Sequence, residues 1–416
     1  MRVLLVGSGG REHALAWKLA QAPSLTDLHA APGSPGIARL GECHPISAKD
    51  AEGLLALAHS LGVGLVVIGP EGPLVTGVAD VLRPAGIAVF GPSAAAAAIE
   101  GSKSFAKDVM AAAGVATAVQ LPVARPPCVV KADGLAAGKG VFVCRSQAEL
   151  DAALKAVAAF GRDFIVEELL EGPEVSLFAI CDGHEAVPLV PAQDFKRAFQ
   201  GDEGPNTGGM GSYAPVPGLD ERMVDELLDT VHRPVLAELN RRGAPFVGVL
   251  FAGLMLTAVG PRVLEFNCRF GDPETQSMLP LVEGDLLEVF VAAAAGELSG
   301  SELVQSSGAA VTVVLAAAGY PEEGDRGSEI TGVEEAEIAG GLVFHAGTAL
   351  QNDRLVTNGG RILGVTGLGD TLAEARTAAY GAAELIEFTG ARRREDIALE
   401  AAEGRTFALH DTSPDV

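Results

Sequence analysis

The sequence is poor in cysteine and lysine, and it has no long hydrophobic run. No window of about twenty apolar residues occurs, which excludes a membrane-spanning helix. The start, MRVLLVGSGGREHA, passes from a short apolar strand directly to glycine and charge, unlike a signal peptide. We therefore expect a globular protein of the cytoplasm.

The five cysteines lie far apart and include no C-x-x-C pair. An odd, scattered set argues against a disulfide framework or a zinc site built on cysteines. We expect these residues to be reduced thiols without a chemical role: Cys43, Cys128, Cys144, Cys181 and Cys268.

Positive charge is scarce, since 30 Lys and Arg face 54 Asp and Glu and the net charge is −24. Nucleic-acid and anionic-membrane partners are excluded, because such binding needs basic clusters. The excess of acid is better explained as a solubility feature.

Lysine is used sparingly: only eight of the 30 cationic residues are lysine, and none follows position 196. Four lie in or beside glycine-rich or turn-like stretches, where a compact ammonium group can bind a phosphate. They are Lys103, Lys131, Lys139 and Lys196. A solvated surface position is the simpler interpretation for three others: Lys18, Lys49 and Lys155.

The length and the 48% hydrophobic content predict about three domains. Strand and helix alternate over residues 1–100, as in a doubly wound parallel sheet. Closely spaced strands from 128 onward, with a helix at 148–160, predict an α+β domain, and residues 306–416 are strand-rich. The expected fold class is α/β and α+β, multidomain. The long stretch 193–218 is expected to be an ordered loop.

The segment GSGGREH, residues 7–13, follows the first strand and suggests a dinucleotide-binding turn. The G-x-G-x-x-G pattern needs glycine where Glu12 stands, and the second strand ends without an acid for a ribose, so this assignment fails. Gly9, Gly10 and a helix that begins at Arg11 leave two equal alternatives: an anion site at helix N-terminal amides, or a plain tight turn.

The segment KADGLAAGKG, residues 131–140, is not a P-loop, because Gly140 leads into a strand and not a helix. Two strands joined by this turn can form a flap over a triphosphate, with Lys131 and Lys139 as phosphate contacts. An ordinary hairpin with solvated lysines is the alternative. The acids at 167–174 form either an acidic edge or groups that bind a base and a ribose.

Residues 265, 267 and 269 have a period of two and therefore share one face of a strand and its extension. The oxygens of Glu265 and Asn267 suit Mg²⁺, which takes few protein ligands and completes its shell with phosphate and water. Arg269 can hold an anionic group. A solvated strand face is the alternative.

Six motifs then occur in a fixed order: EGSKSFAK (100–107), KADGLAAGKGV (131–141), VEELLEGPEVS (166–176), QDFKR (193–197), GPNTGGMG (204–211) and EFNCRFGDPETQ (265–276). Together they resemble the phosphoribosylamine–glycine ligase family of ATP-grasp enzymes, and the similarity runs nearly from end to end. The resemblance implies an N-terminal substrate-binding domain at 1–100, an ATP-grasp domain at 101–305 with its small lobe at about 115–185, and a C-terminal α+β domain at 306–416.

The resemblance also implies the reaction, which belongs to purine biosynthesis. ATP phosphorylates the carboxylate of glycine, and the amine of 5-phosphoribosylamine attacks the glycyl phosphate to give glycinamide ribonucleotide, ADP and phosphate. The implied cofactor is Mg²⁺, with Mn²⁺ as a substitute, and the partners are these small molecules only. We expect a monomer.

Roles for single residues follow from the same resemblance. Metal ligands are Glu265 and Asn267. ATP contacts are Lys103, Lys131, Lys139, Glu167, Glu168, Leu169, Leu170 and Glu174. Substrate contacts are Gly9, Gly10, Arg11, Glu71, Asp194, Lys196, Arg197, Thr207, Gly208, Gly209 and Met210. The catalytic set is Arg269, Asp272 and Lys139, and the turn at 358–361 either reaches the same cleft or is structural.

The chain departs from the family pattern at two points of the small lobe: it lacks a helix before residue 128, and the link at 158–164 is short. The segment FAGLML (251–256) carries no acid, so a second Mg²⁺ has no identified ligand. Three rival functions remain: another ATP-grasp ligase such as a carboxylase, a regulator that binds ATP without turnover, and a thiol enzyme that uses Cys268.

Overall fold

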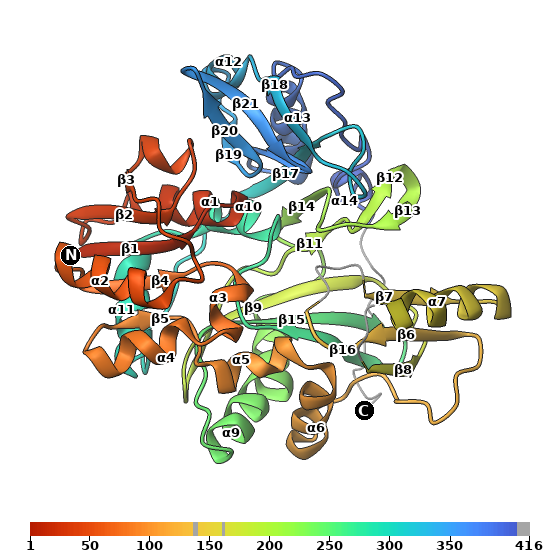
Figure 1. The fold of residues 1–416 in the computed structure, drawn as a ribbon. Helices are drawn as coiled ribbons and strands as arrows, with labels where there is room; N and C mark the ends of the chain where they lie inside the picture. Colours follow the sequence, from red (N-terminus) through yellow and green to blue (C-terminus); the bar gives the residue numbers. More distant parts are fainter. Residues whose placement is uncertain (136–139, 160–162, 406–416) are drawn as a thin grey trace.

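The computed structural model describes residues 1–135, 140–159 and 163–405, so the expected phosphate ligand Lys139 lies outside the described residues. Figure 1 shows the N-terminal part (red) beside a central region and the strand-rich C-terminal part (blue) above both. A small sheet with one helix projects on the opposite side from the N-terminus. Among the described helices, none is long and apolar enough to cross a membrane. The expected multidomain α/β and α+β class is confirmed.

The N-terminal part is a five-stranded parallel sheet in the order β3-β2-β1-β4-β5. Its strands are β1 (Arg2–Gly7), β2 (Asp27–Pro32), β3 (Glu42–Cys43), β4 (Leu65–Ile68) and β5 (Val89–Phe90). The chain order reverses between β1 and β4, and ligands of such sheets bind beyond the carboxyl ends of the strands at this point. The switch point therefore marks a candidate substrate site.

Helices cover both faces of this sheet, which is why β1 is apolar at every position from Val3 to Val6. Val3 and Leu5 pack in the same core as α1 (Gly10–Leu19), whereas Leu4 and Val6 pack in the same core as α2 (Ala51–Leu61). Three shorter helices follow: α3 (Glu71–Val75), α4 (Val78–Leu82) and α5 (Ala94–Gly101). The predicted alternation of strand and helix is confirmed.

Residues 94–98 are all alanine and form the first part of α5. A second helix, α6 (Lys103–Ala113), begins directly after α5. Ser102 separates the two because its backbone is extended (φ −142°, ψ 118°) and its hydroxyl accepts a hydrogen bond from Phe105 N. A serine N-cap satisfies one of the free amides at a helix start. Lys103 therefore lies at the first position of a helix whose start is fixed.

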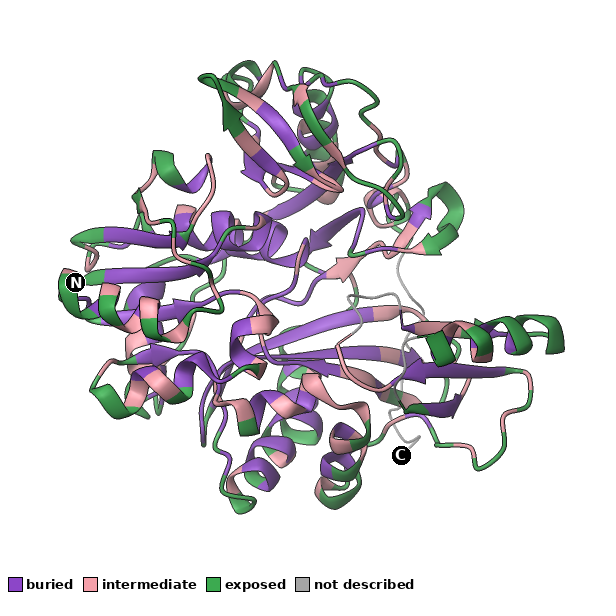
Figure 2. Cartoon of the chain, in the orientation of Figure 1, coloured by how far each residue is buried: buried purple, intermediate pink, exposed green. Residues whose placement is uncertain are grey.

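The small lobe is an antiparallel sheet in the order β7-β6-β8, covered by one helix. The strands are β6 (Cys128–Ala132), β7 (Val141–Cys144) and β8 (Phe164–Glu168), and the helix is α7 (Gln147–Ala159). Leu150, Ala153 and Val157 of α7 pack on the sheet, while its outer face is exposed (Figure 2). As expected, residues 114–127 contain no helix.

The central sheet is antiparallel in the order β10-β9-β15-β16. It comprises β9 (Glu174–Asp182), β10 (Ala186–Pro188), β15 (Val247–Thr257) and β16 (Gly260–Asn267). Residues 221–241 form α8 (Glu221–Leu227), a π-helical turn at 228–232 and α9 (Arg233–Arg241). Figure 2 shows that the strands of this sheet are mostly buried.

The last sheet has the order β11-β14-β17-β22-β19, and it takes two strands from the stretch expected to be a loop. These are β11 (Gln193–Asp194) and β14 (Gly211–Ala214), and they precede β17 (Ala309–Ala316), β19 (Leu342–His345) and β22 (Arg361–Gly369). The prediction of one loop at 193–218 was therefore wrong in part, because pairing with a strand about 100 residues later decided its conformation. The sheet also extends across the expected boundary at 305.

Smaller elements complete the fold. They are the hairpin β12 (Arg197–Phe199) and β13 (Glu203–Asn206), the strands β18 (Asp325–Glu329), β20 (Thr348–Gln351) and β21 (Arg354–Gly359), and the helices α10 (Glu274–Met278), α11 (Leu286–Ala295), α12 (Val333–Ile338), α13 (Leu372–Ala383) and α14 (Leu399–Ala402). Of these, α10 begins right after Asp272 and Pro273, and Asp272 is one of the predicted catalytic residues.

Candidate active site

The polar residues at the end of β16 meet on one face, as their period of two predicts. Arg269 Nη2 donates to Asn267 Oδ1 at 3.2 Å and to Glu100 Oε1 at 3.1 Å. Arg269 Nε lies 3.4 Å from Glu71 Oε2 in the N-terminal part. Because Asn267 and Arg269 are largely enclosed, the alternative of a solvated strand face is wrong.

The carboxylate of Glu265 is surrounded by positive charge. Burial alone would raise its pKa, but four nearby cations outweigh burial and hold the pKa below its usual value. These cations are Lys196, Lys131, Lys103 and Arg269. Glu265 therefore stays ionised at neutral pH, as a metal ligand must be.

The donor set at the end of β16 fits a hard divalent cation. It consists of a carboxylate and an amide, and such oxygen ligands suit Mg²⁺. Among the described side chains, Asn267 Nδ2 and Arg269 Nε are buried polar atoms without a hydrogen-bond partner. Buried polar groups are nearly always satisfied, so these two atoms indicate a site whose function involves additional ligands.

Lys131 is anchored next to Glu265 by a bulge in β16. The register changes from Gly253 opposite Glu265 to Leu254 opposite Val263, which leaves Leu264 as the extra residue. The freed carbonyl of Leu264 accepts a hydrogen bond from Lys131 Nζ at 2.9 Å. Lys131 thereby connects the small lobe to the strand that carries Glu265.

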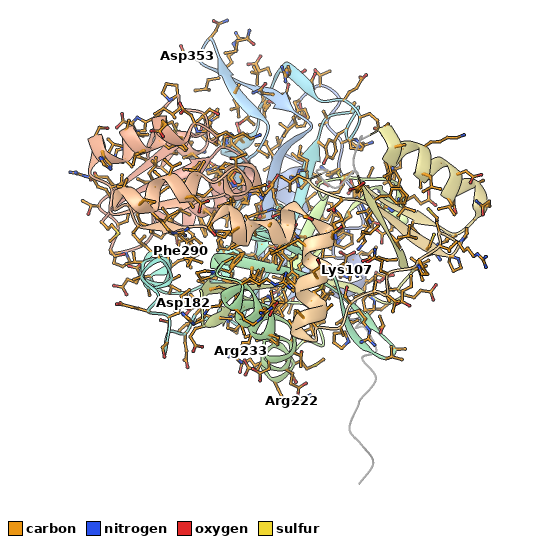
Figure 3. All side chains as sticks on the ribbon, turned by 60° about the horizontal axis from the view of Figure 1, so that its bottom comes forward. Lys107, Asp182, Arg222, Arg233, Phe290 and Asp353 are labelled. Carbon is orange, nitrogen blue, oxygen red and sulfur yellow. The ribbon has the colours of Figure 1, made fainter. Side chains whose placement is uncertain are left out.

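Glu167 forms a buried ion-pair triad that the sequence did not indicate. Its side chain is 1% exposed, Lys131 Nζ lies 2.6 Å from Oε2, and Lys107 Nζ contacts Oε1. Figure 3 labels Lys107, which extends from α6 in the middle of the molecule. The Glu167 carboxylate is thus enclosed by lysines, and its backbone pairs with Val129 of β6 on one side and with Gln120 on the other.

The next three residues of the chain, 168–170, differ in which groups they expose. Glu168 exchanges hydrogen bonds with Val119, through its own amide to Val119 O at 3.0 Å and through Oε1 from Val119 N at 2.8 Å. Leu169 and Leu170 are half-buried. This segment therefore offers apolar surface and backbone groups, and its carboxylates are occupied.

Lys103 links the start of α6 to the loop after β6. Its amide donates to Asp133 Oδ1 at 2.6 Å, and its Nζ donates to Gly134 O at 3.2 Å. Burial lowers the pKa of the Lys103 ammonium, and Lys131 acts in the same direction, whereas Glu265 opposes the shift. The structure brings Lys103 and Lys131 close enough to Glu265 to lower its pKa.

Three acids and one lysine converge beside the metal-ligand candidates. Lys196 Nζ contacts Glu174 Oε1, so the residues predicted to bind phosphate and ribose pair with each other here. Burial raises the pKa of Asp194 well above its usual value although Lys196 opposes this, and burial also raises the pKa of Glu274. Glu274 is 3% exposed and accepts a hydrogen bond from Ser176 Oγ at 3.3 Å.

The switch point of the N-terminal sheet lies next to this region. Arg11 follows β1, Glu71 follows β4, and Arg11 Nη2 lies 3.5 Å from Glu71 Oε2. Arg11 Nη1 also donates to Phe270 O at 3.0 Å, across the gap between the two parts of the chain. The strand order therefore brings together residues that are about 60 and 260 positions apart.

Gly9 and Gly10 lie at the start of α1, where the sequence predicts either an anion site or a tight turn. The Gly9 amide donates to Glu12 Oε2 at 2.6 Å, so an anion binds this amide only by displacing the Glu12 carboxylate. A Cβ on Gly10 would lie 2.6 Å from Gln276 Nε2, so glycine leaves room here for the Gln276 side chain of α10.

Asp272 is held between helices and the C-terminal sheet. Arg361 Nη2 lies 3.3 Å from Asp272 Oδ2, and Gln276 Nε2 donates to Oδ1 at 2.9 Å. Burial would raise the pKa of Asp272, but Arg361 and Arg11 hold it below its usual value. Arg361 also donates to Gly208 O, so the turn at 358–361 does reach this cluster.

The segment 207–211 is a scaffold at this position. Thr207 Oγ1 donates to Lys196 O at 2.9 Å, and Gly209 has a φ of +109° and lies where a Cβ would be 2.4 Å from Pro273. Met210 is fully buried, and both its backbone groups are used in the sheet region, so its expected role as a substrate contact was wrong. Arg197 donates to Gly204 O within its own hairpin.

Lys18 and Cys268 both lie in buried positions. Lys18 does not lie on a solvated face: it is 8% exposed and its Nζ donates to Val282 O, because α1 packs on the segment before α11. Cys268 is buried and its thiol donates to Glu100 Oε2 at 3.2 Å. Burial, reinforced by Glu100, raises the pKa of this thiol well above its usual value, which disfavours a thiolate nucleophile.

Comparisons with known proteins extend over most of the chain. Three family models of phosphoribosylglycinamide synthetase match: the N domain at 1–100, the ATP-grasp (A) domain at 101–275 and the C domain at 310–400. The phosphoribosylamine–glycine ligase of Streptomyces coelicolor is 50% identical, over 97% of this chain and 100% of that protein. The enzyme of the same name from Corynebacterium ammoniagenes is also 50% identical, over 97% and 99%.

Solved structures agree with these relatives. A crystal structure of the phosphoribosylamine–glycine ligase of Thermotoga maritima is 36% identical, covers 96% of this chain and 100% of that one, and has a TM-score of 0.80. The biotin carboxylase domain of the 2-oxoglutarate carboxylase of Hydrogenobacter thermophilus has a TM-score of 0.69 over 98% of this chain and 96% of that one. At 18% identity, that second similarity concerns the fold alone.

Proposed function

This chain belongs to the phosphoribosylglycinamide synthetase family, and on that premise we propose how its residues divide the work of ligating glycine to 5-phosphoribosylamine. The enzyme is an ATP-dependent carbon–nitrogen ligase of purine biosynthesis. Glycine is converted to glycyl phosphate, and attack by the amine gives glycinamide ribonucleotide, ADP and phosphate. The observation that best supports this assignment is the near full-length similarity, together with the cluster at the end of β16.

ATP lies between the small lobe and the central sheet in this proposal. Lys103 and Lys131 neutralise its phosphates, and Lys139 of the glycine-rich segment is a third phosphate contact. The backbone at 167–170 binds adenine against the half-buried Leu169 and Leu170. Glu174 accepts the ribose hydroxyls once Lys196 turns toward a phosphate. These roles rest on the convergence of the lysines around Glu265 and Glu167.

Mg²⁺ is the metal we propose, with Mn²⁺ as a substitute, and Glu265 and Asn267 would hold it. When bound, the ion supplies charge neutralisation to the phosphates during transfer. The carboxylate and amide form the hard oxygen set that this ion prefers. The ionised state of Glu265 supports the proposal.

Arg269 orients the glycine carboxylate for in-line attack on the terminal phosphate. Acyl phosphate formation needs positioning and charge stabilisation more than covalent help. The Arg269 guanidinium is buried beside Asn267, and its Nε makes no hydrogen bond although Glu71 Oε2 lies 3.4 Å away. Asp272 holds the amino group of glycine, since an anionic carboxylate attracts an ammonium group. Lys196 stabilises the transferred phosphate, and Thr207 holds the backbone of Lys196 in place.

Phosphoribosylamine binds at the switch point, where Gly10, Arg11 and Glu71 lie. The first amides of α1 and the Arg11 guanidinium favour its phosphate. Glu71 accepts hydrogen bonds from ribose hydroxyls. The amine then points toward the end of β16, where the glycyl phosphate forms. We further propose that the enzyme acts as a monomer in the cytoplasm, with small molecules as its only partners.

ADP release by purified protein with ATP and Mg²⁺ tests the function. Glycine and phosphoribosylamine, generated from ribose 5-phosphate and ammonia, are added separately and together. Release that requires both substrates supports the ligase. Release with bicarbonate in place of glycine would identify a carboxylase instead, and ATP binding without any release would identify a regulator.

A further inference from the structure

A second group of potential metal ligands lies at the outer edge of the N-terminal sheet. His29 is in β2 and Glu42 is its partner in β3, while His44 follows two positions after Glu42. Residues two apart on an extended chain point to the same side. The three side chains therefore gather on one face of the sheet, at the strand farthest from the switch point.

The ligand atoms are close enough to share one ion. His29 Nδ1 lies 3.2 Å from His44 Nε2 and 3.7 Å from Glu42 Oε2, and one atom from each residue lies within 4.8 Å of the other two. Two nitrogens bound to a tetrahedral zinc ion at about 2.0–2.1 Å are separated by about 3.3–3.4 Å. The observed 3.2 Å between the imidazoles is thus close to the spacing that a tetrahedral ion needs. Among the described residues, this is the one group of His, Cys, Asp and Glu side chains with three such atoms.

The pairing of β2 with β3 already places the three ligand side chains next to one another. His44 N donates to Ala30 O at 2.8 Å, and the β2–β3 ladder pairs His29 with Glu42, so the pairing of the edge strand with β2 holds all three ligands. His29 is buried at 9% exposed, whereas the Glu42 side chain is 69% exposed. An ion can therefore reach the imidazoles from solvent, and water can take a fourth position.

A hydrogen bond between the two imidazoles would account for their contact, but it leaves Glu42 unexplained. The carboxylate is directed toward His29 although it has free access to solvent. Two imidazoles and one carboxylate are the ligand types that zinc and similar borderline ions prefer. The oxygen-only pair Glu265 and Asn267 belongs to a different chemical class.

We propose that His29, Glu42 and His44 form a binding site for a borderline divalent transition ion such as Zn²⁺. The ion connects β3, which is only two residues long, to the inner strand β2. Its role is to stabilise the edge of the sheet, and it is independent of the ligase reaction. No described contact joins these residues to the site around Glu265.

Zinc titration of the untagged, full-length protein tests the proposal. The protein is first dialysed against a chelator, and calorimetry is run without nucleotide or Mg²⁺. We expect one Zn²⁺ per chain, and visible absorption of a four-coordinate ion when Co²⁺ replaces Zn²⁺. His44→Ala should weaken Zn²⁺ binding by more than about 10-fold, the lower bound for changes even in outer-shell partners.

Two further variants separate ligation from folding. His59→Ala removes an exposed histidine of α2 outside the group, and it should bind Zn²⁺ as the wild type does. Glu42→Gln changes an exposed side chain and should weaken binding without loss of ligase turnover. If the wild type binds no Zn²⁺, or if His29→Ala and His44→Ala both retain its affinity, the proposal is wrong.

Discussion

Replacing Lys107 by methionine tests whether the buried carboxylate of Glu167 sets the charge of the ATP-phosphate site. Lys107 and Lys131 share this carboxylate, so the three groups carry a net charge of +1, and without Lys107 they carry none. Methionine keeps the length and the apolar stem of the side chain. The substitution therefore changes charge more than packing.

The magnitude follows from Coulomb's law. One unit charge at about 8 Å from a phosphate is worth about 2 kcal/mol at an effective dielectric constant of about 20. That free energy corresponds to about 30-fold in affinity. In addition, one oxygen of a buried carboxylate loses its cation, which costs about 1–3 kcal/mol of folding stability.

Steady-state kinetics with ATP as the varied substrate provide the assay. We expect Lys107→Met to raise the KM for ATP by about 30-fold and to leave the KM for glycine unchanged, while Lys107→Arg restores most of the ATP affinity. Lys155→Met, on the exposed face of α7, is the matched control and should behave as the wild type. A folded Lys107→Met protein with an unchanged KM for ATP would refute the reasoning.

Four other predictions test separate features. Glu265→Ala should abolish turnover while thermal unfolding stays near that of the wild type, because it removes a metal ligand and no core side chain; normal turnover at limiting Mg²⁺ would contradict the assignment. Cys268→Ala should keep most activity, since burial and Glu100 raise the pKa of the thiol; inactivity of a folded variant would revive the thiol mechanism. Met210→Ala should lower the free energy of unfolding by about 2–5 kcal/mol in urea titrations, through a core cavity, with much smaller effects on substrate KM values. Burial lowers the pKa of His232 to about 4. The free energy of unfolding should therefore fall by at most about 3 kcal/mol as the pH drops from about 6.5 to about 4. Urea titrations of His232→Gln should show a flatter pH dependence over this range.

Local patterns in the sequence were sufficient to predict much of the fold. The apolar run of β1 and the helix after it depend on side-chain periodicity within one short segment, and both appear as expected. The period of two at 265, 267 and 269 likewise determined that these side chains share a face. The ordered motifs identified the family, because each encodes a local backbone shape with its attached chemistry.

Contacts between segments that are distant in the chain could not be predicted from these local patterns. The pairing of β14 with β17 converted part of an expected loop into a strand, and it buried Met210. The triad of Lys107, Lys131 and Glu167 joins a helix and two strands that are about 25 to 60 residues apart. Packing selected these partners, since no residue's own sequence neighbours specify them.

The sequence by itself thus determined the reaction class, the order of the elements and the candidate metal ligands. Only the tertiary structure decided which charges neutralise one another, because a lysine on the surface and a lysine buried against a carboxylate have the same local sequence signal. Lys18, expected in solvent and found buried, illustrates this difference. Charge pairing in a protein interior depends on distances across the fold, and those distances arise only when the sheets and helices have assembled.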